Sequence, residues 1–191
     1  ARKGSFSAAG RELNIPQSTA SRTIATLERE IGVALFVRTT RAVTLTDAGF
    51  LNASSVETLR LTGASTITLG TNAASAGIVN VITGNGATSI TNSNGVTLNV
   101  NAAALANNTV LALVGSSVEV VTGLIGNITA SALTGALTVT TGNATDNSIA
   151  IITGSAATSI TASGASDVVT VTATALAQNT ALTLIGSAAE T

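Results

Sequence analysis

The chain has 191 residues, a formal net charge of −1, three Phe as its only aromatic residues, and neither Cys nor His. These absences exclude disulfides, zinc sites and catalysis by a cysteine nucleophile or a Ser-His-Asp triad. The charge is unevenly placed, +3 over residues 1–52 and −4 over residues 53–191, so a polyanionic partner would meet the N-terminal part.

A break in composition near residue 52 predicts two parts. All three Phe and the single Pro lie within the first 50 residues. We therefore expect one domain over residues 1–52 and a second region over residues 53–191. The sequence contains no run of about 18 apolar residues, so we expect no membrane-spanning helix and no membrane partner.

The first part of the chain indicates a helix, a turn and a second helix. Ser7 is a suitable N-cap for a short helix over Ala8–Leu13, and Asn14 can end that helix. Pro16 suits the start of the next segment because a first helical residue needs no N–H donor. The second helix is predicted over Gln17–Ile31. Its apolar residues recur at steps of four, three and four, which places them on one face: Ala20, Ile24, Leu27 and Ile31.

A β-hairpin and the start of a further helix follow. Gly32 is a suitable C-cap, since glycine accepts a positive φ at that position. Leu35–Arg38 and Ala42–Leu45 can pair as two short strands, with Thr39–Arg41 at the tip between them. Thr46–Gly49 then indicates the first turn of another helix.

This order of elements resembles the winged helix-turn-helix of LysR-type transcriptional regulators over residues 4–49. The resemblance rests on five stretches: Gly4–Ala9, Leu13–Gln17, Leu27–Glu28, Ile31–Val33 and Leu35–Phe36. It implies a winged helix-turn-helix whose core positions are Leu27, Gly32, Leu35 and Phe36. It also implies sequence-specific binding of double-stranded DNA, with the second helix in the major groove and the wing on the backbone.

By the same resemblance, seven residues would contact DNA. Those of the recognition helix are Gln17, Ser18, Thr19, Ser21 and Arg22, and those of the wing are Arg38 and Arg41. Gln can form two hydrogen bonds with adenine and Arg two with guanine, while wing arginines can reach phosphates or the minor groove. The alternative interpretation is a solvated face of a small helical cap, because Glu28 and Glu30 lie beside Arg29 in the same segment.

The second part alternates Ile, Leu or Val with Thr or Asn in short runs, which is typical of strands with one buried face. The runs start about every 8–13 residues, and examples are Thr66–Leu69, Ile78–Ile82, Thr97–Asn101 and Val168–Thr172. Small residues separate them, aromatic residues are absent, and Thr and Asn can stack in ladders. We therefore expect a β-solenoid, with repeated β-sandwiches as the alternative.

The same region contains a duplication of about 70 residues. Residues 67–92 match residues 137–162 with 11 of 26 identities, and residues 97–117 match residues 168–188 with 11 of 21. The second copy stops partway through the pattern, after Ser187–Glu190. An open strand edge is therefore expected there, and such an edge favours self-association.

Together these patterns predict an α+β chain in two parts, a small winged helix-turn-helix followed by an all-β repeat region. The favoured function is that of a LysR-like, DNA-binding transcriptional regulator in the cytoplasm. The alternative is a structural or adhesive fragment, extracellular or at the cell surface. Its repeats would resemble those of bacterial surface proteins, and its head would be vestigial or artificially fused.

An enzyme is not expected, because the Thr, Ser and Asn residues of the repeat region have no general base beside them. We expect no catalytic site, no cofactor and no metal site. Asp146 and Asp167 are the only aspartates of the repeat region, too few for a calcium cage.

Overall fold

The computed structural model describes residues 14, 16–31, 36–38, 43–142, 148–163, 168–186 and 189–190. The expected helix Ala8–Leu13, the cap Gly32 and the core position Leu35 lie outside these residues. Asn14 has a φ of 54°, the left-handed conformation that Asn adopts where a helix or turn ends.

The second helix and the hairpin are confirmed. Helix α2 spans Gln17–Ile31, and β1 (Phe36–Arg38) pairs antiparallel with β2 (Val43–Leu45). The next element is a single 3-10 turn, η1, over Asp47–Phe50.

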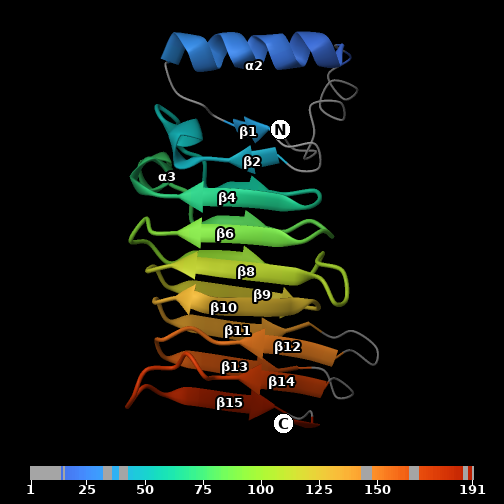
Figure 1. Ribbon diagram of the computed structural model, residues 1–191, viewed down its shortest axis with the longest axis vertical. Coiled ribbons are helices and arrows are strands. Elements are labelled where there is room, and N and C mark those ends of the chain that lie inside the picture. Colours follow the sequence, from blue (N-terminus) through green and yellow to red (C-terminus); the bar gives the residue numbers. More distant parts are fainter. Residues whose placement is uncertain are drawn as a thin grey trace.

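In the described part of the chain, the strands form a nine-stranded and a seven-stranded sheet (Figure 1). The first has the order β1-β2-β4-β6-β8-β10-β12-β14-β16 and the second β15-β13-β11-β9-β7-β5-β3. The further members of the first sheet are β4 (Ser65–Leu69), β6 (Thr88–Asn92), β8 (Val110–Gly115), β10 (Asn127–Leu133), β12 (Ser148–Ile152), β14 (Val168–Thr172) and β16 (Ala189–Glu190). The members of the second are β3 (Thr58–Arg60), β5 (Asn80–Ile82), β7 (Leu98–Asn101), β9 (Glu119–Leu124), β11 (Leu137–Thr141), β13 (Thr158–Ala162) and β15 (Leu182–Gly186).

From β3 onward the chain alternates between the two sheets, and each strand pairs in parallel with the strand two places further along. This arrangement is a β-solenoid, which confirms the predicted fold over the sandwich alternative. A helical turn, α3 (Thr71–Ala76), interrupts the first coils, and the sequence had not indicated it. The short run of Thr, Asn, Ala and Ser there carries no apolar periodicity.

Apolar side chains fill the interior in columns that run along the stack. In the second sheet one column joins residues in register from β5 to β13, all at most 2% exposed: Val81, Val100, Val121, Val139 and Ile160. Small residues are required where coils turn. A Cβ added at Gly115 or Gly154 would collide with the carbonyl oxygen of Asn92 or Leu133 in the preceding coil.

The hairpin and the solenoid share one sheet. Strand β2 pairs in parallel with β4, with Leu45 opposite Ile67, and Phe50 is buried in the same apolar core. The domain boundary after residue 52 stays a prediction, but residues before it extend the solenoid's sheet and core.

Asp47, in η1, stabilises the contact between the segment after the hairpin and the first coil of the solenoid. Its carboxylate accepts hydrogen bonds from the backbone N–H groups of Gly70 (2.7 Å), Ala73 (2.9 Å) and Asn72 (3.1 Å) at the start of α3. A carboxylate is well suited to this place because the first N–H groups of a helix have no intrahelical acceptor.

We expect Asp47→Ala to lower the free energy of unfolding by about 2 kcal/mol, the scale of hydrogen bonds to a charged acceptor. Urea denaturation measures this. Asp47→Asn is the matched variant, since its amide oxygen still accepts, and it should cost less than alanine. Equal stability of the alanine variant and the wild type would contradict the anchoring role.

The duplication has a definite relation to the coils. Its two copies align β4 with β11, β6 with β13 and β8 with β15, so equivalent strands lie seven strands apart in the described order. Two strands make one coil, and the unit therefore covers three and a half coils. Each strand of the first copy consequently lies in the opposite sheet from its equivalent in the second.

The loops after β7 and β14 show the same relation in detail. Leu105 donates its backbone N–H to Ala102, and the equivalent Leu176 donates to Ala173, each at 3.1 Å. Asn108 and its equivalent Asn179 both have a positive φ. The duplicated sequence therefore builds the same loop on both sides of the solenoid.

Candidate nucleic-acid interface

Helix α2 lies across one end of the stack of coils, beyond β1 and opposite to the end at β15 (Figure 1). Its first turn is continuous with the preceding residues, since Thr19 donates its N–H to the Pro16 carbonyl (3.0 Å). Most of its described side chains are exposed: Ser18, Thr19, Arg22, Thr23, Ala25, Thr26, Leu27, Arg29 and Glu30. The helix thus offers a long polar surface to a partner.

The charge along α2 is polarised. Its first turn holds no acidic residue and Arg22 follows in the second turn, whereas Glu28, Arg29 and Glu30 near the C-terminal end carry a net charge of −1. The helix dipole adds partial positive charge at the N-terminus. The N-terminal half of α2 is therefore the more favourable half for a polyanion.

Arg22 and the residues spaced along the helix from it share a surface. Positions 18, 22, 26 and 29 recur at steps of four, four and three, so they follow one side of a 3.6-residue helix. Thr26 accepts a hydrogen bond from the Arg29 guanidinium (3.4 Å). Thr23 instead donates its hydroxyl to the Thr19 carbonyl one turn earlier (3.0 Å). The Arg22 side chain is exposed on this surface.

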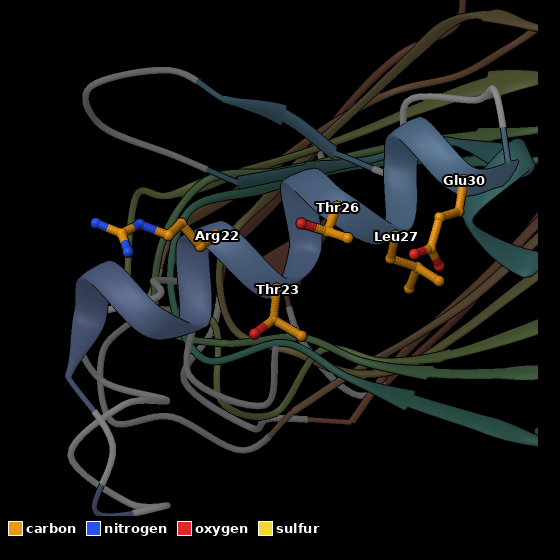
Figure 2. Close-up of a pocket in the computed structure, with 5 residues that line it drawn as sticks. All are labelled: Arg22, Thr23, Thr26, Leu27 and Glu30. Carbon is orange, nitrogen blue, oxygen red and sulfur yellow. The ribbon is translucent and has the colours of Figure 1, made fainter.

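An open hollow of about 370 Å³ lies along α2 and is lined by Arg22, Thr23, Thr26, Leu27 and Glu30. Figure 2 shows Arg22 extending toward one end of this row and Leu27 and Glu30 lying toward the other. The lining combines one cation, one anion, two hydroxyls and one apolar side chain. It lacks the convergent polar groups and enclosure of a small-molecule site.

The structure places the predicted contact residues on two elements. Gln17, Ser18, Thr19, Ser21 and Arg22 all belong to α2, and Ser18, Thr19 and Arg22 are exposed there. Arg38 is the last residue of β1, opposite Val43. Arg41 lies outside the described residues, and so do the side chains of Gln17, Ser21 and Arg38.

One predicted core position is wrong. Leu27 was expected to be a core position by the resemblance to LysR-type regulators, but it is 41% exposed on α2. Ile24, on the same predicted apolar face, is half-buried. The described part of the chain supplies no second helix to cover this face, which explains why the periodicity of α2 alone gave the wrong burial for Leu27.

Sequence reasoning did not single out Thr23 and Thr26. Both are exposed on α2, and Thr26 lies one turn after Arg22. The four-residue spacing from Arg22 is the signal that would have included Thr26.

Among the described residues, no helix is both long and apolar enough to cross a bilayer. Within the same residues, no group of three or more His, Cys, Asp or Glu side chains could hold a metal ion.

Comparison with known proteins assigns the N-terminal segment. Residues 1–50 match the family described as bacterial regulatory helix-turn-helix protein, lysR family. The chain is 61% identical over 49 residues to the uncharacterized HTH-type transcriptional regulator y4mQ of Sinorhizobium fredii, covering 26% of this chain and 16% of that protein. It is 53% identical over 51 residues to the probable cat1 operon transcriptional activator of Acinetobacter lwoffii, covering 27% and 17%.

The match ends at residue 50, before β3, where the chain begins to alternate between the two sheets. The chain spans about a sixth of the length of these curated relatives. No solved structure matches the chain. The first 50 residues therefore carry a helix-turn-helix sequence of the LysR family, and a β-solenoid follows it.

Proposed function

We propose that the chain binds double-stranded DNA sequence-specifically and acts as a transcriptional regulator, with α2 as its recognition helix. The observation that carries this proposal is the exposed, N-terminally positive surface of α2 within a segment that matches LysR-family regulators. Helix-turn-helix proteins place the N-terminal residues of this helix on base edges in the major groove. A regulator of this kind acts in the cytoplasm.

The base-reading role falls on the N-terminal half of α2. Arg22 is the strongest candidate because its guanidinium can form two hydrogen bonds with guanine. Gln17, Ser18, Thr19 and Ser21 complete the contacts with bases and the adjacent phosphates. Glu28 and Glu30 lie toward the C-terminal end of α2, where their negative charge disfavours contact with the phosphates of the DNA backbone.

The wing is the hairpin of β1 and β2. Arg38 ends β1, and Arg41 lies in the connection that precedes β2. Cations there suit phosphates or the minor groove. Because β2 also pairs with β4, the wing would be held by the solenoid's sheet.

Selection from a pool of random duplex DNA tests the proposal with the full chain. We expect enrichment of a preferred sequence and an affinity that falls steeply as salt rises. Arg22→Ala should lose about 1–3 kcal/mol of preference at one base position. Arg60→Ala is the matched control, because it removes the same charge from an exposed residue of β3, far along the chain from α2. Unchanged preference in Arg22→Ala, or no enrichment by the wild type, would refute the assignment.

The alternative, a structural or adhesive β-repeat protein outside the cell, is favoured by one observation. Most of the described chain is solenoid, and between residues 61 and 142 its charged residues number only one, the buried Glu119. Under this alternative the same selection yields no preferred sequence, and α2 has no function in binding.

A further inference from the structure

The sequence contains two Asn-Gly pairs, and both lie in connections between strands of the solenoid. Asn85–Gly86 lies between β5 and β6, and Asn94–Gly95 lies between β6 and β7. Such a pair is chemically labile, because glycine has no Cβ to keep its backbone nitrogen away from the side-chain carbonyl of the preceding asparagine. The two pairs have the same reacting groups, so a difference between them in the folded chain comes from the structure around them.

The Asn94 side chain is held by its own turn. Its Oδ1 accepts the backbone N–H of Val96 at 2.7 Å. A donor therefore already contacts the oxygen on which negative charge grows when a nucleophile attacks Cγ. Its Nδ2 is buried and has no acceptor among the described residues. Loss of this nitrogen as ammonia therefore breaks no hydrogen bond with the described part of the chain.

The Gly95 nitrogen is positioned by the next coil. Its N–H donates to the Oγ of Ser117 at 3.0 Å, and Ser117 is buried between β8 and β9. An acceptor at this N–H favours loss of its proton during an attack. The N–H lies in the peptide plane, so this hydrogen bond leaves the faces of the nitrogen open toward Cγ. Gly95 is exposed, which gives water access to the turn.

A buried pair of side chains fixes the start of the same turn. The Asn92 Oδ1 accepts the backbone N–H of Asn94 (3.3 Å), and the Asn92 Nδ2 donates to the Glu119 carboxyl (2.9 Å). Asn92 and Glu119 are both buried. These contacts hold Asn94 in one arrangement, and holding reacting groups in place removes part of the entropic cost of bringing them together.

The surroundings of the other pair differ. The Asn85 side chain is exposed to water. A Cβ added at Gly86 would lie 2.4 Å from the backbone nitrogen of Ala64, so the backbone of Gly86 is packed against the preceding coil. At Gly95, by contrast, no described atom outside its chain neighbours lies within 4 Å of the position that a Cβ would take. The Gly86 nitrogen therefore has less freedom to move toward the side chain before it.

We propose that Asn94 is a modification site, at which the chain deamidates spontaneously. The Gly95 nitrogen bonds to the Asn94 Cγ, the Cγ–Nδ2 bond breaks, and the proton of the Gly95 N–H leaves on the amide nitrogen as ammonia. Water then opens the five-membered imide at either carbonyl, which gives aspartate or isoaspartate. Either product places a carboxylate within residues 61–118, which contain no charged residue. This proposal stands independently of DNA binding.

Peptide mapping by mass spectrometry tests the site in the full chain, incubated at mildly alkaline pH. We expect Asn94 to convert several-fold faster than Asn85 in the folded chain, with isoaspartate among the products. In concentrated urea the two rates should become similar, because only the shared sequence pair remains. If Asn94 reacts no faster than Asn85 in the folded chain, or if urea leaves the ratio of the two rates unchanged, the proposal is wrong.

Substitution of Ser117 tests the contact with the Gly95 nitrogen. Ser117→Ala should slow the conversion of Asn94 several-fold and leave that of Asn85 unchanged. Ser116→Ala is the matched control, because Ser116 is the exposed neighbour, and its conversion rates should equal those of the wild type. Thermal unfolding checks that both variants fold. Equal conversion of Asn94 in folded Ser117→Ala and in the wild type would contradict the arrangement from which the proposal is argued.

Discussion

Replacing Glu119 by glutamine should raise the free energy of unfolding well above pH 8 by about 5 kcal/mol and leave it nearly unchanged below pH 4.5. Glu119 is 1% exposed and lies in a core column between Leu98 and Leu137. Its Oε1 accepts a hydrogen bond from the Asn92 amide (2.9 Å), while its Oε2 has no partner among the described residues. The pKa of Glu119 is raised from 4.5 to about 8, because burial, which raises it, outweighs the hydrogen bond from Asn92, which lowers it.

The free energy of unfolding falls as the pH rises, because the folded chain holds the Glu119 proton more tightly than the unfolded chain does. Below pH 4.5 the carboxyl is neutral in the folded and the unfolded chain. As the pH rises above 4.5, the unfolded chain loses the proton first, so ionisation favours unfolding. The stability lost in this way grows until the pH passes about 8 and then levels off. A pKa difference of this size corresponds to about 5 kcal/mol, and the neutral amide of glutamine removes it.

Urea denaturation of the wild type and Glu119→Gln across this pH range measures the effect. Glu57→Gln is the control, because Glu57 is exposed and its substitution makes the same chemical change. Parallel stability curves for the wild type and Glu119→Gln would show that the carboxyl does not titrate in the folded protein as expected.

Leu113→Ala should destabilise the solenoid by about 3 kcal/mol, whereas Leu184→Ala should cost less than about 1 kcal/mol in dilute solution. The two residues are equivalent in the duplication, but Leu113 is fully buried between coils and Leu184 is 40% exposed. Truncating a buried leucine loses its transfer free energy and leaves a cavity, while an exposed leucine has little burial to lose.

Chemical denaturation at low protein concentration measures the free energy of unfolding of both variants. The substitution is the same in both, and the residues around the two leucines are similar because of the duplication. Similar losses for both variants would mean that Leu184 is covered by something within the monomer.

Much of this architecture could be predicted because it depends on local periodicity. The apolar spacing within Gln17–Ile31 predicted α2, and the alternation of Ile, Leu and Val with Thr predicted strands such as β14. The burial of Leu27 could not be predicted, because it depends on which other element covers the helix. The contacts of Asp47 with α3 could not be predicted either, because they join residues more than 20 positions apart.

The elements of the candidate site could be predicted from the sequence, but its contacts with DNA bases could not. Its placement on one helix and one hairpin followed from the order of the sequence stretches, and the structure agrees for α2, β1 and β2. Which bases Arg22 or Gln17 would contact depends on a docked duplex, and the periodicity of a helix holds no information about that.

The odd number of strands in the duplicated unit has a consequence for how such a solenoid evolves. Adding one unit moves the surface pattern along the solenoid and also turns it by half a revolution. The outward Ser89 and Thr91 of β6 thus reappear as Ser159 and Thr161 of β13 on the opposite side. The surface period is therefore two units rather than one. A mutation that was fixed before the duplication therefore lies on both faces of the solenoid, once in each copy. A ligand that binds along one face across two neighbouring copies contacts strands that are not equivalent in the ancestral sequence.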